Sequence, residues 1–243
     1  MSDPASDDAL AITADVAAAN RILAREGVLD AFGHVSLRHP ERADRFFLAR
    51  SLAPELVTPA DVLEFTLASQ PVAPTGLSLY SERVIHGAIY RARPDVHAIC
   101  HHHAPAVLPF CLTDLKLRVV TQLGASIGTD VPVWDQRDEF GATNHLVTTE
   151  AEAASLARRL GPHRIVLMKR HGATVVGRSV QELVFRSVYS CRDAELQLAA
   201  LRYGDIDAFT DAEIALASNF PDATLSRAWN YWNARLRGGH LAV

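Results

Sequence analysis

Apolar residues along this chain recur with two different periods, one typical of helices and one typical of strands. Helical spacing predicts helices over 7–26, from 78 or 81 to 93, over 105–111, from 148 or 149 to 161, over 180–203 and around Trp229, Tyr231 and Trp232. Short apolar or alternating runs predict strands at 33–38, 46–49, 62–67, 96–101, 165–168 and 173–176. Successive early strands favour antiparallel pairing. We therefore expect an α/β protein with a central mixed or antiparallel sheet flanked by helices.

The segment 112–147 has no clear period and contains several glycines and a proline, so we expect loops with short strands there. No internal repeat, low-complexity tract or Gly/Ser/Pro-rich linker divides the chain. The sequence therefore predicts a single domain over residues 1–243.

Composition narrows the class of protein. Of the 243 residues, 49% are hydrophobic and 21% are charged, which is ordinary for a globular protein. No run of about 18 apolar residues predicts a membrane span, and the acidic N-terminus does not resemble a signal peptide. The net charge of -4 without a basic block makes nucleic acid an unfavourable partner. Three cysteines without CxxC spacing fit a reducing cytoplasm.

Three consecutive histidines close the apolar strand that begins at Val96. In a strand, residues two apart share a face, so His101 and His103 should point one way and His102 the other. Two neighbouring imidazoles form a ready pair of metal ligands. The alternative is a polar strand end with three solvated histidines. The spacing alone leaves both interpretations open.

Two distant residues extend this candidate site. His171 lies before Gly172 in a turn between two apolar strands, where it is either a structural turn histidine or a further ligand. Glu82 lies near a predicted helix start, where it either interacts with the helix dipole or takes part in chemistry. Three neutral nitrogens and a carboxylate are what a catalytic divalent metal requires.

These residues belong to an ordered set of segments that resembles the class II aldolase/adducin family. The segments are Gly33-His34-Val35-Ser36-Leu37-Arg38, Leu79-Tyr80-Ser81-Glu82-Arg83-Val84-Ile85-His86, Arg93-Pro94-Asp95-Val96, His101-His102-His103-Ala104-Pro105 and Leu167-Met168-Lys169-Arg170-His171-Gly172. The resemblance covers about residues 10–205 and leaves a C-terminal helical tail, 206–243. It implies a three-layer α/β/α sandwich with a mostly antiparallel central sheet. It also implies a homotetramer whose site lies near a subunit boundary.

The resemblance also implies roles for individual residues. His101, His103 and His171 take the positions of the family's metal ligands, and Glu82 takes that of its acid/base glutamate, which can also touch the metal. The implied cofactor is one divalent ion per subunit. Mn, Zn, Co and Fe all remain possible, because the types of ligand do not identify the ion.

The chain departs from the family's sugar-phosphate aldolases where those enzymes bind phosphate. It has Gly33-His34 in place of Gly-Asn, Ser51-Leu52 near a Thr-Gly, and Tyr80-Ser81 in place of Ser-Ser. Bulk and an imidazole at these substrate-binding positions argue against a phosphorylated sugar. The Gly-His pair and the segment Arg50-Ser51-Leu52-Ala53-Pro54 resemble the family's decarboxylase branch, which acts on hydroxylated aromatic dicarboxylates. There Arg50 would bind a substrate carboxylate, whereas otherwise it is a surface arginine.

We therefore expect a cytoplasmic, metal-dependent carbon–carbon lyase. The expected reaction is decarboxylation of a small hydroxylated aromatic carboxylate of the hydroxypyridine dicarboxylate or dihydroxyphthalate type. Glu82 is the first choice as the acid that protonates the ring carbon, and His34 is the second. An aldolase or dehydratase that acts on a small hydroxy-carbonyl compound is the main alternative. An iron oxygenase and a non-catalytic adducin-like module are further alternatives, which the sequence favours less.

Overall fold

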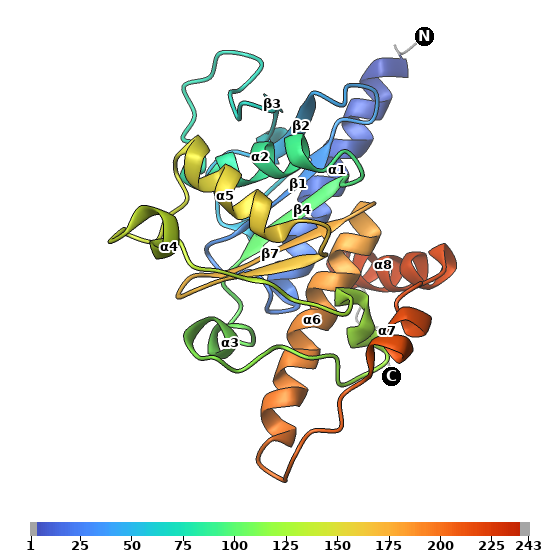
Figure 1. The fold of residues 1–243 in the computed structure, drawn as a ribbon. Coiled ribbons are helices and arrows are strands. Elements are labelled where there is room, and N and C mark those ends of the chain that lie inside the picture. The colour runs from blue at the N-terminus through green and yellow to red at the C-terminus, as the bar shows by residue number, and fades with distance from the viewer. Residues whose placement is uncertain (1–3, 239–243) are drawn as a thin grey trace.

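The computed structural model describes residues 4–238, and a seven-stranded sheet forms its centre (Figure 1). The strand order is β3-β2-β1-β4-β7-β6-β5. The strands are β1 (His34–Arg38), β2 (Arg45–Ala49), β3 (Val62–Thr66), β4 (Ala98–His102), β5 (Val133–Trp134), β6 (Ile165–Met168) and β7 (Gly172–Gly177). Strand β5 pairs with β6 in parallel, and all the other neighbouring strands pair antiparallel. The expected mostly antiparallel sheet is confirmed.

Helices cover both faces of this sheet (Figure 1). The α-helices are α1 (Pro4–Arg25), α2 (Val84–Ala92), α3 (Leu108–Leu112), α4 (Arg137–Phe140), α5 (Glu150–Leu160), α6 (Val180–Ala200), α7 (Asp211–Ala217) and α8 (Asp222–Leu236). Helices α1, α6 and α8 pack together over one face, and α2 and α5 lie side by side over the other. None of the helices in the described part of the chain is long and apolar enough to cross a membrane.

Alternation along the central strand explains why each face has its own apolar core. In β4, Ala98 and Cys100 belong to the core under α1 and α6, whereas Ile99 belongs to the core under α2 and α5. All five residues of β4 are buried, as expected for a strand covered on both sides. The sheet therefore places the side chain of His101 on the α2/α5 face and that of His102 on the α1/α6 face.

Local signals in the sequence explain several helix ends. The predicted C-cap Gly27 has a φ of +74°, a left-handed conformation that glycine adopts at little cost. Thr149 caps α5 with a reciprocal capping box to Glu152, and Ser179 caps α6 by accepting from the backbone N–H of Glu182. These N-caps place the starts of α5 and α6 where the sequence predicts them.

Other boundaries differ from the expectations. Neither Ser78 nor Ser81 caps α2, because residues 81–83 form a 3-10 turn first and the helix begins only at Val84. Helix α3 begins at Leu108, after a turn that follows Pro105. Helix α7 was not predicted, although Thr210 and Glu213 form a capping box at its start. The segment 112–147 consists mainly of loops, with β5, α4 and a 3-10 turn, Leu123–Ile127.

Candidate metal centre and active site

The C-terminal end of β4 brings the first two candidate ligands together. His101 is the fourth residue of β4, and His103 follows the strand, so their side chains emerge on one face. Their Nε2 atoms lie 3.1 Å apart. His101 is fully buried and His103 is partly buried, so the pair lies at the inner end of a site that opens toward solvent.

The hairpin between β6 and β7 delivers the third histidine. Arg170 has a φ of +62°, and this left-handed residue turns the chain so that His171 faces β4. The guanidinium of Arg170 pairs with Asp135, the residue after β5, at 2.9 Å. This ion pair ties the strained turn to the neighbouring strand.

The three Nε2 atoms form a tight triangle, with 3.2 Å between His101 and His171 and 3.0 Å between His103 and His171. The Nδ1–H of His171 donates to the carbonyl of His145 at 2.5 Å, which leaves its Nε2 with a lone pair. Burial lowers the pKa of His103 to about 4, with a further contribution from the neighbouring His101 and His171. Burial also lowers the pKa of His101, which favours a neutral imidazole.

Glu82 completes the group from a different part of the chain. It lies in the 3-10 turn before α2 and is only 7% exposed. Its Oε1 accepts from the backbone N–H of Val147 at 3.0 Å, and its two oxygens lie 3.6 and 3.5 Å from the Nε2 atoms of His101 and His171. Burial by itself would raise the pKa of this carboxyl, but the two histidines outweigh that effect and hold the pKa far below its usual value. The carboxylate is therefore ionised beside the imidazoles.

The donor set fits a divalent metal ion. The ligand atoms of Glu82, His101, His103 and His171 all lie within 4.8 Å of one another. Nitrogens bound at about 2.0–2.1 Å to a tetrahedral metal would be about 3.3–3.4 Å apart, close to the separations seen here. Burial alone would lower the pKa of His171, but the neighbouring Glu82 carboxylate outweighs burial and raises this pKa, so metal binding at His171 would displace a proton. The structure thus brings together all four residues of the predicted set.

His34 lies beside this group and leads into a buried hydrogen-bond chain that the sequence did not predict. In the sheet register, His34 on β1 is the direct partner of His101 on β4. Its Nδ1 lies 2.7 Å from Nε2 of His86, whose Nδ1 lies 2.6 Å from the hydroxyl of Ser36. That hydroxyl lies 2.8 Å from the hydroxyl of Tyr90. Because every member is buried, the chain fixes the orientation of the His34 ring.

A cavity of about 650 Å³ opens in front of Glu82, His34 and His103. Ser51, Tyr80 and Ser81, the three other positions expected to contact substrate, all lie in its wall. The rest of the lining is formed by glycine and apolar residues, namely Ala31, Phe32, Gly33, Leu52, Ala53, Leu56 and Leu146. In the part of the chain that the structure describes, no Lys or Arg lines this cavity.

Arg50 is the one candidate substrate-binding residue that does not line the cavity. Its Nε donates to Asp61 at 2.7 Å, and its side chain is one third exposed. It precedes Ser51, and the adjoining loop is held by the hydroxyl of Tyr80, which donates to the carbonyl of Leu52. The structure therefore places Arg50 behind the wall, where its nearest anion is a carboxylate of the chain itself.

His102 faces away from the other histidines, as the strand period predicts. The alternative of three solvated histidines is wrong, because His101 and His102 are fully buried. Nδ1 of His102 accepts from the backbone N–H of Ala104 at 3.3 Å, and burial lowers its pKa to about 3. This burial could not be predicted from the sequence, because a histidine at a strand end can equally well be solvated.

Comparison with known proteins finds a matching family model and relatives of similar length. Residues 14–198 match the family model described as Class II Aldolase and Adducin N-terminal domain. Decarboxylase tropJ of Talaromyces stipitatus is 34% identical over 244 residues, which cover 90% of this chain and 92% of that protein. The 3,4-dihydroxyphthalate decarboxylase of Terrabacter sp. (strain DBF63) is 31% identical over 237 residues, with 91% of this chain and 95% of that protein covered.

A solved structure shares the whole fold. The L-fuculose 1-phosphate aldolase from Glaciozyma antarctica PI12 superposes with a TM-score of 0.80 and covers 98% of this chain and 94% of that one. Its sequence identity is 22%. The likeness confirms the expected three-layer arrangement.

Proposed function

Because this chain belongs to the class II aldolase and adducin N-terminal domain family, we propose that it is a metal-dependent decarboxylase of a small hydroxylated aromatic carboxylate. The proposed metal ligands are His101, His103 and His171, and the proposed catalytic residues are Glu82 and His34. Relatives that cover nearly the whole chain are named decarboxylases, and one of them is named for dihydroxyphthalate.

The observation that carries this proposal is the chemistry of the cavity wall. A sugar phosphate needs several donors for its phosphoryl oxygens, yet the lining among the described residues holds no Lys or Arg and is largely apolar. Phe32, Leu56 and Leu146 remain 69%, 62% and 40% exposed although they are apolar, and all three line the cavity. Exposed apolar side chains around a site are typical of binding surfaces, here for a flat hydrophobic ring.

The residues of the chain suggest how a proton moves during the reaction. A metal ion bound by the histidines would supply a Lewis acid that stabilises negative charge on the ring hydroxylate and a neighbouring carboxylate. Glu82 is ionised, so it must first take up a proton, and the acidic ring hydroxyl of the substrate can supply one. Glu82 then returns this proton to the ring carbon that carries the carboxylate. The bond to that carboxylate breaks, CO2 leaves, and its bonding electron pair stays in the ring.

A substrate screen tests the proposed function. The purified protein is supplied with Mn, Zn, Co or Fe in turn, and CO2 release is measured from dihydroxyphthalates and hydroxypyridine dicarboxylates. We expect CO2 release from at least one aromatic acid and none from the same ring without its hydroxyl. Turnover of a sugar phosphate, with no reaction of any aromatic acid, would instead identify an aldolase. Oxygen uptake with the iron-loaded protein would identify an oxygenase.

A role for Arg50 in substrate binding is a separate prediction. Arg50→Lys keeps the positive charge but loses the planar guanidinium that can donate two parallel hydrogen bonds to a carboxylate. It should therefore raise KM about tenfold with little change in kcat. Because Arg50 pairs with Asp61, the matched control is Asp61→Asn, which removes that partner but leaves the guanidinium. If Asp61→Asn reproduces the effect of Arg50→Lys, Arg50 acts by holding the loop and does not bind the substrate.

A further inference from the structure

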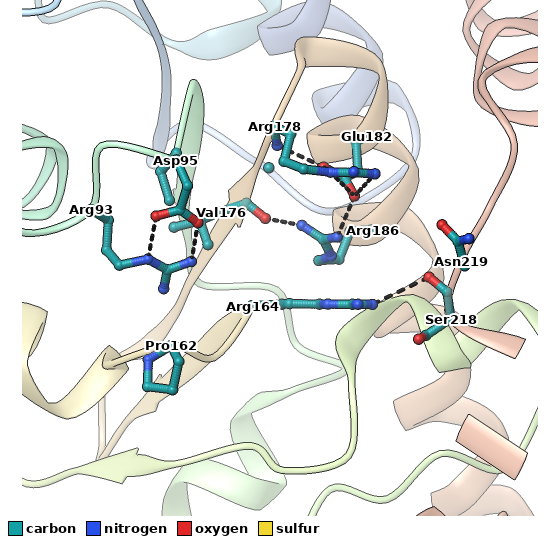
Figure 2. A pocket seen from close by; sticks show the side chains of 12 residues that line it. Arg93, Asp95, Pro162, Arg164, Val176, Arg178, Glu182, Arg186, Ser218 and Asn219 are labelled. Atoms are coloured by element: carbon teal, nitrogen blue, oxygen red, sulfur yellow. Dashed lines mark hydrogen bonds and ion pairs between the residues drawn. The ribbon is translucent and has the colours of Figure 1, made fainter. Parts of the chain in front are cut away.

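Another cavity, of about 270 Å³ and lined by many charged side chains, lies at the end of the sheet away from the histidines. Figure 2 shows the side chains that line it. It is bordered by Val96, which precedes β4, by Gly177, which ends β7, and by Arg164, which precedes β6. The metal ligands lie at the opposite ends of β4 and β7. The charged side chains in its wall are Arg93, Arg164, Arg178, Arg186, Asp95 and Glu182.

The charges in this wall do not balance. Arg93 is neutralised by Asp95, with which it forms two hydrogen bonds of 2.8 and 2.6 Å. Arg178 and Arg186 share one carboxylate, Glu182, at 3.2 and 2.8 Å. Arg164 donates only to the backbone carbonyls of Ser126 and Ser218. The described wall thus holds three guanidinium groups and one carboxylate besides the Arg93–Asp95 pair, and Asp222, outside the wall, also acts on Arg178 electrostatically.

The imbalance is greatest where two guanidinium groups meet. Arg164 and Arg186 both donate to the carbonyl of Ser126, at 3.3 and 2.7 Å, so two like charges share one acceptor. The side chain of Arg186 is only 5% exposed. Burial, together with the positive charges of Arg164 and Arg178, lowers the pKa of Arg186 to about 10 despite the contact with Glu182. An anion in the cavity would relieve this repulsion.

Donors remain available to bind such an anion. Within residues 4–238, Arg164 uses only Nη1 for hydrogen bonds and Arg178 uses only Nε, Nη2 and its backbone N–H. The side chains of Ser218 and Asn219 line the same cavity across from Arg186 (Figure 2). A buried water needs roughly 10–15 Å³ of such space, so this cavity has room for a polyatomic anion and its hydration.

We propose that this cavity is a binding site for a phosphate dianion, either free or as a monoester. The excess of guanidinium groups over carboxylates in the wall favours an anion, and guanidinium groups match the oxygens of a phosphate group in geometry. The site is independent of the metal centre, so it stands whether or not the proposed decarboxylase activity is correct.

Thermal unfolding of the full-length protein tests this proposal. Inorganic phosphate or methyl phosphate is titrated at constant ionic strength, with sodium chloride as the reference salt. We expect a saturable rise in Tm, because a ligand that binds only the folded state stabilises it. A response to both phosphates identifies a site for the phosphoryl group in general, whereas a response to inorganic phosphate alone identifies a site for the free ion. A Tm that is the same in phosphate as in sodium chloride of equal ionic strength overturns the proposal.

Two variants in the cavity wall test whether phosphate binds there, and a third serves as their control. Arg178→Gln is the main test, because this side chain is 67% exposed and its replacement should leave the fold intact. It should weaken phosphate binding roughly 10- to 100-fold, the usual effect of losing a charged hydrogen bond. Arg164→Gln should do the same but also lower Tm without phosphate, since Arg164 holds the carbonyl of Ser218.

The matched control is Arg158→Gln on α5, another exposed arginine that pairs with a glutamate. It should leave the phosphate response unchanged. Equal affinity for phosphate in Arg178→Gln, Arg164→Gln and the wild-type protein would show that these arginines only stabilise the ends of the strands and do not bind phosphate. Both cavity variants keep the metal centre. Phosphate that binds at the metal would therefore raise the Tm of these variants as much as that of the wild-type protein.

Discussion

His103→Ala is expected to release the metal and to lower kcat by about 10³-fold or more. Nε2 of His103 lies within 3.1 Å of the corresponding atoms of His101 and His171, and alanine supplies no donor in its place. Lewis-acid stabilisation by a metal is worth several kcal/mol, and each 1.36 kcal/mol is a factor of ten in rate. Elemental analysis of the purified variant measures the first effect, and CO2 release measures the second.

Two controls separate loss of a ligand from general damage. His97→Ala removes an exposed histidine one residue before β4 and should keep both metal and activity. His102→Asn should lower Tm, because His102 is fully buried, but should keep its metal, because the side chain faces the other side of the sheet. A His103→Ala protein that retains stoichiometric metal and activity contradicts the proposed ligand set.

Glu82→Gln is expected to lower kcat by on the order of 10²–10⁴-fold, the usual contribution of a general acid or base. Glutamine keeps the size of the side chain and can still accept from the N–H of Val147, so the 3-10 turn should hold its position. It cannot take up a proton from the ring hydroxyl and return it to the ring carbon. Steady-state kinetics, combined with metal analysis of the same preparation, measures the effect.

The outcome of this substitution also decides whether Glu82 is a ligand. Metal retained at a low kcat assigns it to proton transfer, whereas metal lost with residual chemistry assigns it to the metal. Wild-type kcat would rule out the proton-transfer role and direct attention to His34. Glu41→Gln, an exposed glutamate in the loop before β2, is the matched control and should change neither quantity.

The histidines could be predicted because their arrangement depends on local rules. Alternation within one strand is enough to place His101 and His103 together, and Gly172 marks the turn that presents His171. The sequence could not show that these segments meet, because β4 and β7 pair in the sheet although they lie about 70 residues apart in the chain. The resemblance to a family supplied that link, and the four ligand atoms do come together.

The hydrogen-bond chain behind His34 could not be predicted in the same way. Ser36, His86 and Tyr90 come from β1 and α2, and their contacts arise only once α2 packs on the sheet. His86 and Tyr90 are four residues apart, which is also the spacing of an ordinary buried helix face. For Arg50 the role stays a prediction. Its sequence context indicates a substrate carboxylate, and the sequence did not show that Asp61, at the end of the 3-10 turn Pro59–Asp61, pairs with it.

The two parts of the proposed active site are built on different kinds of backbone. The histidines lie at strand ends in the middle of a covered sheet, whereas most of the cavity wall comes from the loops 31–33, 51–56 and 146. Loop sequences can drift without unfolding the sheet, so new substrates can arise by mutation while the reactive centre is inherited unchanged. A library that varies Phe32, Leu56 and Leu146 should therefore yield variants with altered ring preference far more often than inactive ones. The same separation would let natural selection redirect this scaffold among acids of different shape.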